Sequence, residues 1–415
     1  MSLHLSPASL CGRIAAIPSK SDAHRALIAA SLGDRPLTLS LPVLSEDLFA
    51  TIRCLRALGA DIAVRKETCT VSPILTPPKE AILPCGESGS TLRFLLPVAA
   101  ALGVRATFTG EGRLPARPLA DLLAALTAHG VTVSGDTLPL TLSGHLRPGT
   151  FTLPGHVSSQ YLTGLLLAFP LLNAPSRLRL TTPPESVGYL AMTVRTLSRF
   201  GITAEKTAEG YTCSGGPYRT PDALPIEGDW SDAAVFLAAG ALGGPVTVTG
   251  LCPNSPQGDR AILSLLRQFG AKVTVEGDAV TVSAAPLTGI PADLRDIPDL
   301  LPVLAVLGAA AEGTTRLYNA ARTRLKECDR LHAMAELLTA LGGQAAEEAD
   351  ALILRGGPLS GGQADDCADH RIVMAAALAA LIAAGPVTVP HPEAVAKSHP
   401  DFFRDYQRLG GLAHE

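Results

Sequence analysis

The hydrophobic pattern of this chain repeats about every 70 residues. Six leucine-rich or aromatic stretches each end on a glycine, at positions 59, 130, 201, 270, 342 and 410, so the steps are 71, 71, 69, 72 and 68 residues. A second set of polar positions has the same period, and each member opens a new apolar run: Lys20-Ser21, Ser90, Ser159, Ser231, Asp299 and His370. The pattern indicates six copies of one structural unit, with reactive residue types at equivalent places.

Each repeat combines helix and strand patterns. The glycine is typical of a left-handed helix cap, and β-branched stretches from Val131 and Lys272 follow two of these glycines as predicted strands. Runs from Ser19 and Gly86 have apolar residues at helical spacing, which predicts a second helix per repeat. We expect three repeats to close into one α/β domain with helices inside sheets, twice over, and the proline-rich segment 221–228 to link the halves.

Composition narrows the class of ligand. A chain of 415 residues with 47% hydrophobic content is long enough for more than one domain. Only 4% of the residues are aromatic, which argues against a stacking platform for single-stranded nucleic acid. The net charge of -4 gives no general attraction to phosphate backbones, so anion binding must come from local clusters of Arg and Lys. We expect a small anion as ligand.

The cysteines and the chain start indicate a reducing compartment. Eight cysteines form no C-x-x-C pair, so neither a zinc site nor a disulfide framework is predicted. The N-terminus lacks a signal-peptide pattern, and the most apolar run, Ile372–Ala384, is too short to span a bilayer. We expect a cytoplasmic protein without membrane or nucleic-acid partners, and a monomer because no extra interface element is evident.

Predicted helix starts bear the residue types that bind anions. The first turn of a helix exposes unpaired N–H groups and the positive end of the dipole, so Ser, Gly, Lys and Arg there form an anion site. The residues at such starts or beside them are Lys20, Ser21, Arg25, Gly89, Ser90, Arg93, Arg117, Ser158, Ser159, Gln160, Ser186, Tyr189, Lys326, Glu327, Arg330, Arg371 and Lys397.

Taken singly, these motifs have plain structural explanations. Ser158-Ser159 is typical of an ordinary N-cap, and Asp299 also fits a helix cap. The stretch LKECDR fits a solvated helix face, His370 with Arg371 fits a structural pair, and GESGS does not match a P-loop. Independent caps, however, have no reason to gather six or more cations at equivalent repeat positions.

Nine segments resemble the 5-enolpyruvylshikimate-3-phosphate synthase family in the same order along nearly the whole chain. They are SKSDAHRAL, CGESGSTLR, GEGRLPARP, VSSQYLTGLL, QGDR, IPDLLPVLA, LKECDRL, DHRIVMA and AKSHPDFF. The resemblance implies transfer of the enolpyruvyl group from phosphoenolpyruvate to the 5-hydroxyl of shikimate 3-phosphate, with release of phosphate. This reaction uses no metal or organic cofactor and lies in the shikimate pathway to chorismate and aromatic amino acids.

The resemblance also implies a fold and a domain division. The family has two domains of three βαβαββ units each, an inside-out α/β barrel, which close over the substrates. Residues 19–227 would form one domain, and residues 1–18 with 228–415 the other, with the active site in the cleft between them.

By resemblance, two sets of residues bind the substrates. The phosphoenolpyruvate set is Lys20, Gly89, Arg117, Gln160, Arg330, Arg371 and Lys397. The shikimate 3-phosphate set is Ser21, Arg25, Ser158, Ser159, Gln160, Ser186, Tyr189, Asp299 and Lys326. Paired planar hydrogen bonds from Arg suit a ligand with both carboxylate and phosphate groups.

The chemistry needs a base for the 5-hydroxyl and an acid for the methylene carbon. Asp299 is the candidate base, Glu327 the candidate acid, and Lys20 assists proton transfer and stabilises the departing phosphate. Glu327 would need a raised pKa, which the surrounding cations oppose. The division of roles among the three residues is a hypothesis.

Three positions depart from many relatives. Glu87 stands in place of Asn and would repel anions unless Arg93 or another cation pairs with it. Arg322 also replaces Asn and would add a contact to the shikimate phosphate, while Phe94 replaces Pro. Ser90, Arg93 and His370 complete the supporting set with Glu87 and Arg322. Because Gly89 leaves room for the ligand, we expect glyphosate to inhibit.

Two alternatives remain at this point. UDP-N-acetylglucosamine enolpyruvyl transferase shares fold and donor, but usually has Lys-Asn at Lys20-Ser21 and a reactive Cys at the position of Gly112. A non-catalytic repeat protein that binds a phosphorylated metabolite would need neither a base nor an acid.

Overall fold

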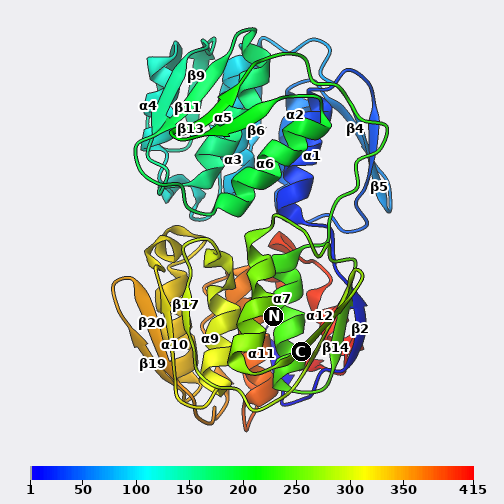
Figure 1. Cartoon of the computed structure of the whole chain (residues 1–415), viewed down its shortest axis with the longest axis vertical. Helices are drawn as coiled ribbons and strands as arrows, with labels where there is room; N and C mark the ends of the chain where they lie inside the picture. The colour runs from blue at the N-terminus through cyan, green and yellow to red at the C-terminus, as the bar shows by residue number, and fades with distance from the viewer. Residues whose placement is uncertain (1) are drawn as a thin grey trace. The chain divides into compact units, whose positions relative to one another are not determined.

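The protein is described by a computed structural model that covers residues 2–415. The chain divides into two compact units (Figure 1). The N-unit is Pro18–Ile226, and the C-unit combines the residues up to Ile17 with Glu227–Glu415. Residues 214–227, which include most of the predicted linker, contain no helix or strand.

The helices fall into two alternating sets. The first set is α1 (Lys20–Ser31), α3 (Gly89–Ala101), α5 (Ser159–Ala168), α7 (Trp230–Leu242), α9 (Leu301–Ala310) and α11 (His370–Ile382). The second set is α2 (Glu46–Ala57), α4 (Ala120–Ala128), α6 (Val187–Arg199), α8 (Ile262–Phe269), α10 (Arg330–Ala340) and α12 (Phe402–Arg408). Five members of the first set begin within one residue of the polar positions that repeat in the sequence, and short η4 (Pro298–Leu300), which holds Asp299, precedes α9. The helix starts predicted at the repeating polar positions are therefore confirmed.

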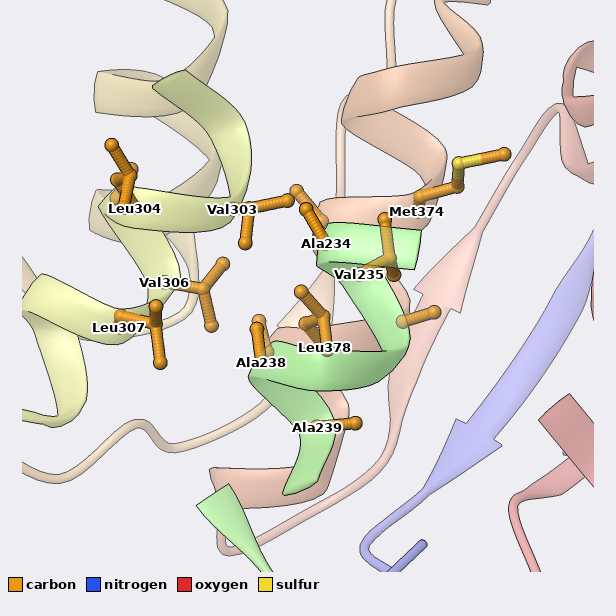
Figure 2. Packing of buried hydrophobic residues seen from close by; sticks show 14 of the residues in the cluster. Ala234, Val235, Ala238, Ala239, Val303, Leu304, Val306, Leu307, Met374 and Leu378 are labelled. Atoms are coloured by element: carbon orange, nitrogen blue, oxygen red, sulfur yellow. The ribbon is translucent and has the colours of Figure 1, made fainter. Parts of the chain in front are cut away.

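Helices of the first set are buried because they have almost no polar face. In α3 every residue except Ser90 is buried, and a helix that is apolar all round must be surrounded by other elements. Figure 2 shows how α7, α9 and α11 pack in the C-unit through small and branched side chains such as Ala238, Val306 and Leu378. Helices of the second set end one or two residues before the repeating glycines.

All six of those glycines adopt the left-handed conformation. Their φ angles are 105° at 59, 93° at 130, 75° at 201, 105° at 270, 87° at 342 and 104° at 410. Residues with a side chain are strained at these positive φ angles, so glycine is the favoured residue at the end of each helix. The predicted helix ends are confirmed.

The strands within residues 2–415 form six small sheets, five of which have four strands. In the N-unit they are β3 (Leu37–Ser40), β4 (Asp61–Val64), β5 (Thr68–Ser72), β6 (Glu80–Pro84), β7 (Arg105–Thr109), β8 (Val131–Ser134), β9 (Leu140–Gly144), β10 (Thr150–Leu153), β11 (Ser176–Leu180), β12 (Ala204–Thr207) and β13 (Gly210–Cys213). In the C-unit they are β1 (Leu3–Ser6), β2 (Gly12–Ala15), β14 (Val246–Thr249), β15 (Lys272–Glu276), β16 (Ala279–Ser283), β17 (Pro291–Asp293), β18 (Thr314–Tyr318), β19 (Gln344–Glu347), β20 (Ala351–Arg355), β21 (Gly362–Gln363), β22 (Val387–Val389) and β23 (Leu412–His414).

One strand order recurs through the sheets. In β6-β7-β9-β8 the first pair is parallel and the other pairs are antiparallel, and β10-β11-β13-β12 and β17-β18-β20-β19 repeat this order. In the C-unit, β2 supplies the parallel strand beside β14, and β1 lies between β22 and β23. The sheet β3-β5-β4 has three strands. The first two strands of the chain thus complete two sheets whose other strands lie within residues 246–283 and 362–414.

Candidate active site

In the N-unit, side-chain contacts join the start of α1 to α2, and α2 to α3. Lys20 is the first residue of α1, and its Nζ lies 2.8 Å from Oδ2 of Asp47 in the first turn of α2. The hydroxyls of Thr51 in α2 and Thr91 in α3 are 2.7 Å apart. Ser88 caps α3, because its Oγ accepts the backbone N–H of Thr91 at 3.2 Å. Lys20 is therefore fixed with respect to a helix start that can bind an anion.

Gly89 and Arg117 lie against each other at the start of α3. A Cβ atom at position 89 would stand 2.7 Å from Nη1 and 3.0 Å from Cζ of Arg117. The next carbonyl, that of Pro118, accepts Nη2 of Arg93 at 3.2 Å and also the hydroxyl of Tyr161. These two donors hold the segment that presents the Arg117 guanidinium over the first turn of α3.

Gln160 joins α3 to α5. Its Oε1 accepts from Nη1 of Arg93 at 2.6 Å, and its Nε2 donates to Oγ of Ser90 at 2.9 Å. Ser158 is the N-cap of α5, with its Oγ accepting the backbone N–H of Gln160 at 3.3 Å, and Ser159 is the first helical residue. The cap role of Ser158 is confirmed, and Ser90, Arg93 and Gln160 form one connected group.

Arg25 connects α1 with α5 and α6 from a buried position. Its guanidinium donates to the Ser21 carbonyl at 2.5 Å, the Tyr189 carbonyl at 3.0 Å, and the hydroxyls of Thr193 at 2.9 Å and Thr163 at 3.3 Å. Burial lowers the pKa of Arg25 to about 10, so the group stays charged at neutral pH. Ser21, Arg25 and Tyr189, which were predicted as one binding group, are thus neighbours.

Three further predicted residues lie at turns or helix boundaries. Ser186 is the N-cap of α6, with a left-handed φ of 55°. The side chain of Glu87 packs on Gly112, where an added Cβ would stand 2.1 Å from Oε1. Nη2 of Arg322 donates to the carbonyl of Arg295 at 3.0 Å.

In the C-unit, Asp299 stands at the centre of a cation cluster. Its Oδ1 lies 2.8 Å from Nη1 of Arg330, 3.3 Å from Nζ of Lys326 and 3.6 Å from Nε of Arg371. Burial acts to raise the pKa of Asp299, but Lys326, Arg371 and Arg330 together outweigh it and hold the pKa well below its usual range. Asp299 is therefore ionised at neutral pH, and it lies inside η4 rather than at the N-cap positions of η4 and α9, which are Ile297 and Leu300.

Arg330 is buried among three carboxylates. Besides Asp299, it donates from Nη2 to Oε2 of Glu327 at 2.6 Å and from Nε to Oδ2 of Asp369 at 2.9 Å. Asp369 also caps α11 by accepting the backbone N–H of Arg371 at 2.8 Å. Lys326, Arg330 and Arg371 are thus matched by three carboxylates, so this cluster is balanced in charge, whereas the sequence alone suggested a surplus of cations.

The last two predicted residues of the C-unit lie at element ends. His370, the first residue of α11, is buried with its Nδ1 3.7 Å from Oδ1 of Asp369, so the contact seen is with Asp369 and the suggested pair with Arg371 stays a prediction. Lys397 ends the short helix η6 (Pro392–Lys397) and is 8% exposed.

Sequence reasoning missed three carboxylates. Asp47 faces Lys20, Asp369 faces Arg330, and Asp259 is 2% exposed with its Oδ2 accepting the hydroxyl of Ser231. Burial, with help from Asp299, raises the pKa of Asp259 to about 7. Signals for two of them existed: Asp369 directly precedes His370-Arg371, and Asp259 lies in the QGDR segment, to which no role was given.

Among residues 2–415, no group of three or more His, Cys, Asp or Glu side chains is arranged to hold a metal ion. Within the same range, every helix is too short or too polar to cross a membrane.

Comparisons with known proteins extend over almost the entire chain. The sequence model of EPSP synthase (3-phosphoshikimate 1-carboxyvinyltransferase) matches residues 6–406. A 3-phosphoshikimate 1-carboxyvinyltransferase from Clostridium novyi is 40% identical over 423 residues, with 99% of this chain and 97% of the relative covered. One from Methanocorpusculum labreanum is 38% identical, with 100% of both chains covered.

Solved structures agree on the fold. An EPSP synthase from Acinetobacter baumannii has a TM-score of 0.85 at 24% identity, with 100% of both chains covered. The enolpyruvyl transferase NikO from Streptomyces tendae has a TM-score of 0.79 at 22% identity, covering 100% of this chain and 98% of that one. The predicted enolpyruvyl transferase fold is confirmed. With the family model and the curated relatives, these matches show that the chain belongs to the EPSP synthase family.

Proposed function

We propose that this protein transfers the enolpyruvyl group of phosphoenolpyruvate to the 5-hydroxyl of shikimate 3-phosphate and releases phosphate. Membership of the EPSP synthase family supports this reaction. The observation that supports it most directly in the structure is the Asp299 cluster, where an ionised carboxylate lies among cations suited to bind anions. A protein that only binds a metabolite has no need of that combination.

We propose that phosphoenolpyruvate binds to cations from both units. In the N-unit, Lys20, Gly89 and Arg117 offer two charges and the open start of α3, and Gln160 is fixed beside them. In the C-unit, Arg330, Arg371 and Lys397 complete the set. A ligand with a phosphate and a carboxylate requires several charge-assisted hydrogen bonds, and Arg provides them in pairs.

We propose that shikimate 3-phosphate binds to the starts of α1, α5 and α6. Their hydroxyls and backbone N–H groups suit a phosphate, and Arg25 suits the ring carboxylate. Arg25 has five N–H donors, and four contacts to the N-unit are already made, so the carboxylate must take the remaining donor or replace one contact. The residues assigned to this ligand are Ser21, Arg25, Ser158, Ser159, Gln160, Ser186, Tyr189, Asp299 and Lys326.

The proposed reaction is an addition followed by an elimination. The 5-hydroxyl oxygen bonds to C2 of phosphoenolpyruvate while Asp299 takes the hydroxyl proton and Glu327 gives a proton to C3. The C2–O bond to phosphate then breaks, a proton leaves C3 for the Glu327 carboxylate, and the proton held by Asp299 passes to the departing phosphate, which Lys20 stabilises.

The charge environment of Asp299 sets a condition on this mechanism. A carboxylate whose pKa is held far below normal is a weak base. Substrate anions that bind Lys326 and Arg371 would share the charge of those cations and so raise the basicity of Asp299. Base strength would then develop only when the substrates are bound.

The Gly112 position weighs against the UDP-N-acetylglucosamine alternative. Gly112 has a φ of 54°, which residues with a side chain rarely adopt, and an added Cβ would displace the Glu87 side chain, so the reactive Cys of that family fits this backbone poorly. A colorimetric phosphate assay with phosphoenolpyruvate and either acceptor tests the proposal. We expect phosphate release with shikimate 3-phosphate and none with UDP-N-acetylglucosamine. Release with UDP-N-acetylglucosamine, or no release with either acceptor, would reject the proposal.

We also propose that the protein works as a cytoplasmic monomer without nucleic-acid or membrane partners. The net charge of -4 and the low aromatic content support the absence of nucleic acid. Light scattering after size exclusion tests the monomer, with a mass of 42.9 kDa expected.

A further inference from the structure

The helix η6, which ends at Lys397, is too short to hold its own position. It has six residues of 3-10 type, and such helices have poorer hydrogen-bond geometry than α-helices. Residues 398–401 then form an irregular segment with turns until α12 begins at Phe402. Val395 packs η6 into the core of the C-unit, and side-chain contacts at both ends of η6 add to this anchoring of Lys397.

His399 makes such contacts two residues after Lys397. Its Nδ1 lies 2.9 Å from Oδ1 of Asp232 in the first turn of α7, and its Nε2 lies 3.1 Å from Oδ2 of Asp405 in α12. Its backbone N–H donates to the carbonyl of Val395 within η6 at 2.7 Å. The ring is 1% exposed and so joins three elements from a buried position.

Both ring nitrogens of His399 face carboxylate oxygens. A neutral imidazole has one donor and one acceptor, so one carboxylate would meet a lone pair; only the imidazolium donates to both. Burial acts to lower the pKa of His399, but Asp232 from α7 and Asp405 from α12 raise it to about 10. The edges of the Phe236 and Phe402 rings complete the surroundings.

We propose that His399, as an imidazolium held between Asp232 and Asp405, is a positioning residue that fixes Lys397 for phosphoenolpyruvate. The other end of η6 is fixed similarly: His391 donates its backbone N–H to the buried carboxylate of Asp366 at 2.8 Å, and its Nδ1 lies 2.7 Å from that group. Asp232 directly follows Ser231, which bonds to Asp259, so the anchor also links Lys397 to the start of α7. The catalytic consequence rests on the proposed function.

The test compares wild type with His399→Gln and Asp405→Asn, and with Asp401→Asn as a matched control. Asp401 pairs with Arg404 on the exposed side of α12. For His399→Gln at pH 7 we expect KM for phosphoenolpyruvate to rise about tenfold or more, with KM for shikimate 3-phosphate changed less than threefold.

The Asp405→Asn variant keeps the His399 ring and its contact with Asp232. It therefore still tests the proposal if His399→Gln fails to fold. Because one source of the raised pKa is lost, KM for phosphoenolpyruvate in this variant should rise between pH 7 and 9. Wild type and Asp401→Asn should stay flat over that range. Equal KM values in all four proteins, or a flat profile for Asp405→Asn, would overturn the proposal.

Hydrogen exchange of the backbone amides of residues 395–399 separates this proposal from the proposed function. Faster exchange in His399→Gln is expected whether or not the wild type turns over shikimate 3-phosphate. An inactive wild type with fast-exchanging His399→Gln would reject the proposed function and keep the anchor. Unchanged exchange in that variant would reject the anchor itself.

Discussion

Gly89 and Arg117 are so close that a methyl group at position 89 would displace the Arg117 guanidinium. A Cβ at position 89 would stand 2.7 Å from Nη1 of Arg117, so Gly89→Ala should push the guanidinium from its place over α3. We expect about tenfold weaker inhibition by glyphosate and a higher KM for phosphoenolpyruvate. Gly357→Ala, where an added Cβ meets no atom within 4 Å, is the control. A wild type insensitive to millimolar glyphosate would contradict the expected inhibition.

The roles of Asp299 and Glu327 are separable by pH-rate profiles. Asp299→Asn removes the proposed base from among three cations, and Glu327→Gln removes the proposed acid beside Arg330. We expect kcat to fall by roughly 100-fold or more in each, because general acid and base groups contribute about that factor. In the pH profile of kcat, Asp299→Asn should change the acidic limb and Glu327→Gln the alkaline limb. Near-normal turnover in both variants would remove these assignments.

Asp259 makes stability depend on pH. Its pKa is raised to about 7, whereas an unfolded Asp titrates near ~3.9, so between these values the folded state holds a proton that the unfolded state has lost. Its contribution is thus full below about pH 4 and is lost as pH rises towards 7. The free energy of unfolding of Asp259→Asn should exceed that of wild type by about 1–3 kcal/mol at pH 8. At pH 4 the two proteins should have similar free energies of unfolding. Urea unfolding measures this, with exposed Glu336→Gln as control.

At the scale of elements, a buried hydroxyl chain joins three helices of the N-unit. Nδ1 of His24 in α1 lies 2.7 Å from Oγ1 of Thr51 in α2, which bonds at 2.7 Å to Thr91 in α3, and Thr91 donates to the Ser88 cap at 2.8 Å. Thr51→Val keeps the shape but leaves buried partners unpaired, which costs about 1–3 kcal/mol each. Thr38→Val in the exposed Thr38–Thr70 pair should cost about 0.5 kcal/mol or less. Similar melting temperatures for both variants would contradict this.

Local pattern predicts elements better than it predicts partners. The glycine ends and polar helix starts were predictable because each depends on residues within one turn of itself. The strand pairs Leu3–Val389 and His4–His414 were not, because no periodicity links positions so far apart in the chain. Likewise the sequence identified Arg330, Asp299 and Glu327 as separate site residues but predicted neither their ion pairs nor Asp369, since charge pairing depends on packing.

At the scale of the whole molecule, the proposed reaction needs residues from both units. Lys20 and Arg117 belong to the N-unit, and Asp299, Glu327 and Arg371 to the C-unit. Each unit has its own core, formed around its own three buried helices, so each is a rigid support for its part of the site. The chain passes between them at Ile17–Pro18 and at Ile226–Glu227, which leaves two short connections as the places where motion is expected.

We propose that the two anionic ligands together draw the units closed. Carboxylates match the cations around Asp299, so closure must gain its free energy from contacts that bound ligand makes with both units. Small-angle scattering should show a smaller radius of gyration with shikimate 3-phosphate and glyphosate together than with either alone. Arg371→Ala should abolish this difference while keeping the unliganded radius. An unchanged radius in wild type with both ligands bound, established by calorimetry, would reject ligand-driven closure.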